Sequence, residues 1–203
     1  MAIFGHIPIW LQAGLWGLLA ASSLVIGAAT AYVAHLGVKV TAAIMSFGCG
    51  ILISAVAYDL VFEGFRSAGI WPVILGAVAG SIAYALANWL VSRHGGKHRK
   101  RSGDQQQDAS AGGGLAIAIG SLLDGIPESV VLGVSLLGGG GVSLSVFAAV
   151  FFSNFPEGLS SATGMKKAGR GKLYIFGLWT AIAVISGFAS LLGPRSSAAR
   201  HPG

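Results

Sequence analysis

Charged residues and cysteines are both scarce in this chain. Only 10% of its 203 residues are Asp, Glu, Lys or Arg, whereas a soluble domain carries about 25%. Because 54% of the residues are hydrophobic, the composition excludes an ordinary water-soluble globule and a disordered chain. The single cysteine, Cys49, excludes an intramolecular disulfide and any zinc site built from several cysteines. The composition instead predicts a membrane protein.

Six apolar runs are long enough to cross a bilayer as helices, which takes about 20 residues. The runs are Ile9–Ala34, Val40–Phe62, Ile70–Val91, Gly114–Leu137, Leu144–Met165 and Leu173–Leu192. Strands are excluded because the apolar residues do not alternate with polar ones. Helices satisfy their backbone amides within lipid. The sequence therefore predicts an all-α, polytopic transmembrane helical bundle that forms one domain, residues 1–203.

Glycine is abundant in these runs, with 32 residues in the chain. Small residues let helix backbones approach one another inside a bilayer. The spacing of Gly76 and Gly80 in the third run has two readings. It is either a small-residue contact face or a simple consequence of the frequency of glycine.

Positive residues are distributed unevenly between the two ends of the predicted helices. Three of the 13 Lys and Arg residues, Arg66, Arg195 and Arg200, lie on one side, and the others follow the first, third and fifth runs. Cytoplasmic connections carry the excess of Lys and Arg. We therefore expect a multi-pass protein of the cell (inner or plasma) membrane with both termini outside. Positive charge in such connections indicates topology and contact with membrane lipids, not nucleic-acid binding.

Two polar segments interrupt or follow the apolar runs. Residues 94–113 read as a flexible basic cytoplasmic loop, and residues 194–203 as a polar tail. The loop's basic stretch either sets topology and attracts anionic lipid headgroups or collects metal ions weakly through His94 and His98. We favour the first interpretation, because two histidines without partner ligands make a poor site.

Three acids, Asp124, Glu128 and Glu157, fall inside the fourth and fifth runs. A carboxylate at that depth costs at least about 2.5–3.5 kcal/mol. The sequences Asp124-Gly-Ile-Pro-Glu128 and Ser153-Asn-Phe-Pro-Glu157 align on their Pro-Glu pairs. In each segment the two outer residues are four apart and share a helix face. Each proline also frees the carbonyl four residues earlier, so both helices offer oxygen ligands.

No Lys, Arg or His lies between Arg101 and Lys166, so neither run holds a counter-charge for its acids. Protons or metal ions must then neutralise them. One interpretation is a cation site. The alternative is that the acids are protonated and cap the carbonyls that the two prolines free.

Two further features have competing interpretations. Asp59 and Glu63 near the outer end of the second run either concentrate cations at an entrance or form a solvated helix end. For Cys49, between two glycines, a small packing residue is favoured over a metal ligand.

The paired Pro-Glu segments resemble the fourth and fifth helices of the Zrt/Irt-like (ZIP) metal-ion transporters, which carry a His-Asn-x-Pro-Glu-Gly type motif followed by an x-Pro-Glu-Gly motif. The glycine-rich stretch Phe47-Gly48-Cys49-Gly50 and the basic loop before the fourth run are also similar to that family. The resemblance implies that Glu128 and Glu157 bridge one or two divalent cations within the membrane. Asp124 and Asn154 would be further ligands and Ser153 a weaker one. A homodimer is implied by the same resemblance.

The chain departs from the family pattern in several places. Asp124 replaces histidine and Gly125 replaces asparagine, and the sixth run carries no acid. An all-oxygen site suits Mn²⁺, Fe²⁺ or Mg²⁺ better than a histidine-bearing one does, and zinc stays open because the carboxylate pair alone binds it. The family usually has eight helices, so six runs indicate a C-terminally shortened chain, through truncation, a frameshifted end or a genuinely short variant.

The sequence therefore predicts a divalent metal-cation transporter for uptake of Zn, Fe or Mn type ions, with the ion as substrate and no organic cofactor. The alternative is a non-transporting or truncated membrane protein that binds or senses metal. An enzyme is not expected. Ser160 and Ser161 weakly suggest a protease nucleophile, which requires a nearby base, and no histidine lies inside a run.

Overall fold

The computed structural model describes residues 7–34, 36–93, 113–136 and 141–192, and within these ranges the chain is helical and has no strand. The helices are α1 (Ile9–Val33), α2 (Val38–Ala55), η1 (Val56–Val61), α3 (Phe62–Ala68), α4 (Ile70–Arg93), α5 (Gly113–Ser135), α6 (Leu144–Lys167) and α7 (Lys172–Ser190). The π-helical segment η1 joins α2 to α3 without a break, so these three elements form one long helix. The prediction of an all-α fold is confirmed.

Each of the six apolar runs coincides with a helix, and the second run extends beyond Phe62 to Ala68. Among the described residues, four helices are long and apolar enough to cross a membrane: Ile9–Val33, Lys39–Ala68, Ile70–Leu90 and Lys172–Ser190. The helices α5 and α6 are not among these four. They carry the three acids Asp124, Glu128 and Glu157 and several serines. These four apolar helices are consistent with a membrane protein, whereas the six-span topology stays a prediction.

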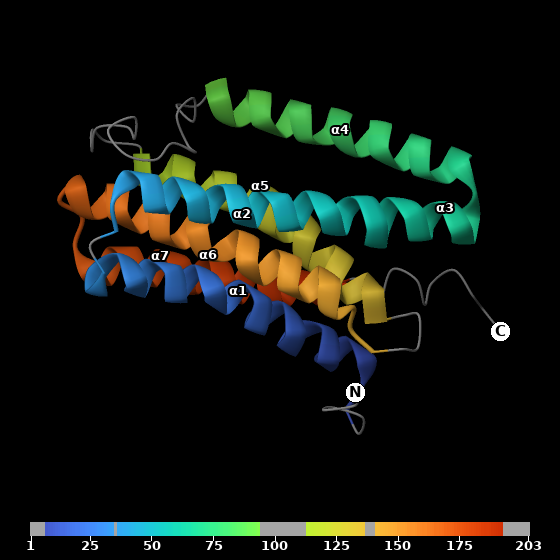
Figure 1. Cartoon of the computed structure of the whole chain (residues 1–203), viewed down its shortest axis with the longest axis horizontal. Coiled ribbons are helices and arrows are strands. Elements are labelled where there is room, and N and C mark those ends of the chain that lie inside the picture. Colours follow the sequence, from blue (N-terminus) through green and yellow to red (C-terminus); the bar gives the residue numbers. More distant parts are fainter. Residues whose placement is uncertain (1–6, 35, 94–112, 137–140, 193–203) are drawn as a thin grey trace.

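Helix α1 packs against α5, α6 and α7, and α2 packs against α6. Consecutive long helices run in alternate directions along the longest axis of the molecule (Figure 1). The buried face of α1 consists mainly of small residues: Ala13, Gly17, Ala20, Ala21, Ser23, Leu24, Gly27, Ala28 and Ala31. Their helical spacing makes a stripe on which the backbones of α6 and α7 can lie closely. On the α7 side of this stripe, Trp179 and Ile175 are fully buried in the largest apolar cluster.

Helix α4 lies at the side of the bundle. It follows α3 after Gly69, whose φ of 82° belongs to the left-handed region that glycine adopts without strain. None of the described side chains of α4 is buried, and its ribbon runs beside the long α2–η1–α3 helix (Figure 1). A Cβ built at Gly76 or Gly80 would meet no atom within 4 Å. The interpretation of Gly76 and Gly80 as a helix contact face is therefore wrong within one chain. The face of small residues that other helices contact lies on α1 instead.

The C-terminal ends of α1, α4 and α6 lie at the same end of the bundle (Figure 1). There the Nζ of Lys166 donates a hydrogen bond to the carbonyl of Ala31 at 3.3 Å. The same ammonium lies 4.8 Å from the centre of the Tyr32 ring, and that of Lys172 lies 5.5 Å from it. The predicted loop (except Gly113, which begins α5), the predicted tail, His94 and His98 lie outside the described residues.

Candidate functional site

A cavity of about 470 Å³ lies where α2, α4, α5 and α6 meet. Its wall consists of Met45, Cys49 and Leu52 of α2, Tyr84 of α4, Leu123, Asp124, Pro127 and Glu128 of α5, and Ser153, Pro156, Glu157, Ser160 and Ser161 of α6. These lining residues include three carboxylates and no Lys, Arg or His. Both Pro-Glu segments therefore open onto one space.

Four of the five predicted ligands line this cavity: Asp124, Glu128, Ser153 and Glu157. Their four-residue spacing on α5 and α6 places each pair on one helix face, as the sequence predicts. Asn154 is only 5% exposed and is not among the lining residues. One residue along a helix turns the side chain by about 100°, and this rotation separates Asn154 from Ser153.

The two prolines differ in the surroundings of the carbonyls that they free. Leu123, four residues before Pro127, is itself a lining residue of the cavity. The carbonyl oxygen of Phe152, four residues before Pro156, instead faces Gly48 of α2, where a built Cβ would lie 2.8 Å from it. Glycine at this position lets α2 approach the backbone of α6.

Glu157 is positioned by a residue that the sequence analysis missed. The hydroxyl of Ser121 on α5 donates a hydrogen bond to Glu157 Oε1 at 2.7 Å. Ser121 is 3% exposed, and its part-buried bond holds the carboxylate of α6 to α5. The signal was present in the sequence, because Ser121 precedes Asp124 by three residues and shares its helix face.

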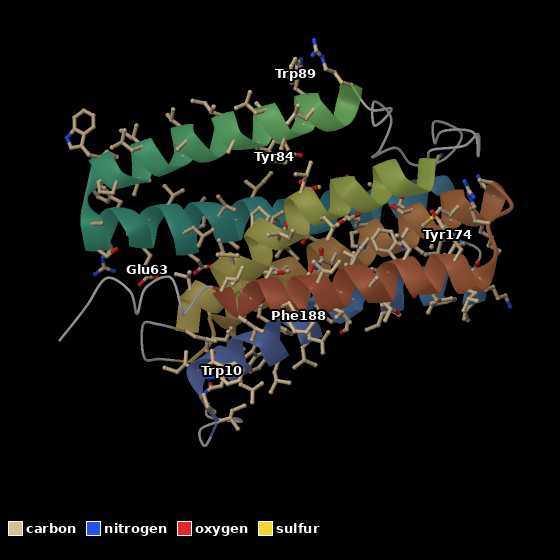
Figure 2. All side chains as sticks on the ribbon, turned by 180° about the vertical axis from the view of Figure 1, so that it is seen from behind. Trp10, Glu63, Tyr84, Trp89, Tyr174 and Phe188 are labelled. Atoms are coloured by element: carbon tan, nitrogen blue, oxygen red, sulfur yellow. The ribbon has the colours of Figure 1, made fainter. Side chains whose placement is uncertain are left out.

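The sequence prediction also omitted several residues that line the cavity. Ser160 and Ser161 follow Glu157 by three and four residues, so extending the helical face by one turn identifies them. Cys49, which the sequence favours as a packing residue, lines the cavity and is exposed. Tyr84 lies on the side of α4 that faces α5 (Figure 2). No local pattern marks Tyr84, because its place in the wall depends on how α4 lies against the bundle.

Asp59 and Glu63 do not line the cavity. Asp59 is half-buried within η1, and Glu63 is exposed on α3 close to the turn into α4 (Figure 2). The π-helical turn alters the four-residue register that the sequence analysis assumed for this pair. Their role as a cation entrance stays a prediction.

The cavity is wide compared with a bare metal ion. In the described ranges, no three His, Cys, Asp or Glu side chains are grouped closely enough to hold one metal together. Six waters at about 30 Å³ each fill roughly 180 Å³, so the cavity can admit a cation with its first hydration shell. Direct coordination by several carboxylates would require a change of their side-chain rotamers or of the helix positions.

Comparisons of the chain with protein-family models, with curated proteins and with solved structures found no match in any of the three. The resemblance to ZIP transporters therefore stays a prediction that depends on the two Pro-Glu segments.

Proposed function

We propose that this chain is a membrane transporter of a divalent metal cation, with the cavity between α2, α4, α5 and α6 as its binding site. One observation carries the proposal: Asp124 and Glu128 of α5 and Glu157 of α6 line the same cavity. Intramembrane acids that face a cavity typically mark ion or proton pathways. The paired Pro-Glu segments favour a ZIP-type protein, in which such carboxylates bind the transported ion.

The cation would enter with its hydration shell and lose water as the walls approach. Carboxylate oxygens suit divalent metals, and Ser121 keeps one oxygen of Glu157 directed by its hydrogen bond. When the metal leaves, protons can take its place on the carboxylates, since metals and protons compete for the same oxygens. This exchange neutralises the site in both states.

Alternating access to such a site requires two groups of helices to move relative to each other. The contact between α2 and α6 suits this movement, because Gly48 offers no side chain to interlock with Phe152 or Pro156. In the proposed orientation all six long helices cross the cell membrane. The basic helix ends that include Lys39, Arg93 and Lys166 face the cytoplasm.

Uptake into proteoliposomes tests the proposal. Vesicles that contain the purified protein should accumulate Mn²⁺, Fe²⁺ or Zn²⁺, and Glu128→Gln and Glu157→Gln should each abolish accumulation. Asp104→Asn and Asp108→Asn are matched controls that remove acids of the predicted cytoplasmic loop and should leave most of the flux. Equal flux in all four variants would contradict the proposal. Saturable metal binding without flux would favour the alternative of a non-transporting metal-binding protein.

A further inference from the structure

Positive charge gathers where α6 turns into α7. Four cationic residues follow one another closely there: Lys166, Lys167, Arg170 and Lys172. Among the described acids, Glu157 is the one that α6 carries, and it precedes Lys166 by nine residues, or about 13 Å along the helix. Glu63 lies at the opposite end of the bundle from Tyr174, which marks the start of α7 (Figure 2). The positive end is therefore well separated from these acids.

The ring of Tyr32, near the end of α1, brings two of these charges together. The Nζ of Lys166 lies 4.8 Å from the ring centre and that of Lys172 lies 5.5 Å from it. Lys166 also bonds the carbonyl of Ala31, and the Tyr32 ring stacks on Phe176 of α7. An aromatic face attracts each ammonium group but leaves both charges in place, so they repel each other. An anion bound beside them would offset this repulsion.

The start of α7 adds to the attraction for an anion. Its N-cap residue, Gly171, has no side chain that could bond the first amides, and the first turn contains no acid. The first N–H groups of a helix are its positive dipole end. Arg170 lies directly before this cap, with its guanidinium 5.3 Å from the Tyr174 ring. Side-chain cations from two helices and a turn thus surround one uncapped helix start.

Two large apolar side chains beside these charges are strongly exposed. Val33 follows Tyr32 and is 85% exposed, and Leu173 follows Lys172 and is 90% exposed. Both lie at the ends of α1 and α7, which are long and apolar enough to cross a membrane. A free phosphate would leave these side chains in water. A phosphate that carries acyl chains would cover them.

We propose that the end of α1 and the α6–α7 turn form a binding site for an anionic phospholipid. Lys166 and Lys172 bind its phosphate, and Val33 and Leu173 contact its acyl chains. Tyr32 lies between these groups, as aromatic residues typically do at a membrane–water interface. The bound lipid ties the ends of α1, α6 and α7 together. The inference requires α1 and α7 to lie in a bilayer but does not depend on metal transport.

This site differs from a general attraction of basic segments to an anionic membrane surface. Such an attraction acts on every lysine near the surface and falls off within a Debye length. The proposed site instead depends on the two lysines that share the Tyr32 ring. Lys39 is the matched comparison, because it is an exposed lysine at the start of α2 and at the same end of the bundle (Figure 1).

Native mass spectrometry of the purified protein in one detergent measures the binding. Dioleoylphosphatidylglycerol should bind more tightly than dioleoylphosphatidylcholine, which has the same acyl chains but no net charge. Lys166→Gln and Lys172→Gln should each lower the affinity for phosphatidylglycerol about fivefold, since a basic residue near an anionic surface contributes about 1 kcal/mol. Their affinity for phosphatidylcholine should change far less, which controls for folding. Lys172→Arg should keep the affinity, and Lys39→Gln should leave it unchanged.

Three outcomes would overturn the inference. Equal affinities of the unaltered protein for the two lipids would show that the headgroup charge is not recognised. An equal loss in Lys39→Gln, Lys166→Gln and Lys172→Gln would reduce the effect to general surface attraction. Displacement of phosphatidylglycerol by inorganic phosphate at matched concentration would identify a site for free phosphate, for which Val33 and Leu173 are not needed. None of these outcomes bears on metal flux, so the proposed function would be tested separately.

Discussion

Gly158 brings the backbone of α6 against that of α1, and its replacement by alanine tests this contact. A Cβ built on Gly158 would collide with the carbonyl oxygen of Leu24 and would lie 2.9 Å from Leu24 Cα. Both atoms belong to the backbone, so no change of rotamer relieves the clash, and the helices must separate. Because Glu157 precedes Gly158, the same displacement would move a carboxylate of the cavity.

The magnitude follows from two opposing terms. An extra methyl group in a well-packed interior costs about 1–3 kcal/mol, whereas alanine favours a helix over glycine by about 1 kcal/mol. Gly80→Ala on α4 is the matched control, because no atom lies within 4 Å of a Cβ built there. Both variants gain the same helix propensity of alanine over glycine. Their unfolding free energies should therefore differ by the packing cost alone, about 1–3 kcal/mol. At about 2–4 °C per kcal/mol for this chain length, the unfolding midpoints should differ by about 2–12 °C.

Thermal unfolding of the purified variants in one detergent, followed by circular dichroism, provides the measurement. Gly27→Ala is a second variant of the same contact, since its Cβ would collide with the Phe155 oxygen and lie 2.8 Å from the Leu159 nitrogen. Both Gly158→Ala and Gly27→Ala should unfold at a lower temperature than Gly80→Ala. Coincident midpoints for all three would refute the close approach of α1 and α6.

Substitutions at three further positions, Ser121, Ser186 and Lys166, test single interactions. Ser121→Ala removes the donor to Glu157 and should weaken Zn²⁺ binding, measured by calorimetry, about tenfold or more, because a hydrogen bond to a charged group contributes about 1.5–3 kcal/mol. Ser121→Thr should restore the affinity. An unchanged affinity in Ser121→Ala would show that the bond does not position the carboxylate. Ser186→Ala, which removes a buried hydroxyl without a hydrogen-bond partner, should leave the unfolding midpoint unchanged or raise it, and a clear decrease would contradict this. Lys166→Ala removes the hydrogen bond to Ala31 and the contact with the Tyr32 ring and should lower the unfolding free energy by about 0.5–1 kcal/mol. Its control is Lys39→Ala, at an exposed helix start. Equal losses of unfolding free energy in both variants would argue against the Lys166 contacts.

The helical ranges could be predicted from the sequence because they depend on local properties. The run Leu144–Met165 became α6 (Leu144–Lys167) with only its last residues extended. A continuous apolar stretch has one way to satisfy its backbone in lipid, so its length and position determine the helix. The π-helical turn at Val56–Val61 could not be predicted in this way, because no residue in it breaks the helical pattern.

Part of the candidate site was equally local. A four-residue spacing places Asp124 and Glu128 on one face of α5 whatever the rest of the chain does, and both line the cavity. The same reasoning was too narrow on α6. It included Asn154, which is buried outside the cavity wall, and omitted Ser160 and Ser161, which lie one turn beyond Glu157.

The sequence by itself determined where the helices lie and which acids share a helix face. Only the tertiary structure decided that Ser121 bonds Glu157, that Cys49 borders the carboxylates, and that small residues pack on α1 and not on α4. Helical periodicity is a property of a single segment and orders the side chains around one axis. Which faces meet depends on how closely pairs of backbones can approach and how all side chains between them fill the space. That arrangement belongs to the whole bundle, so no single segment contains it.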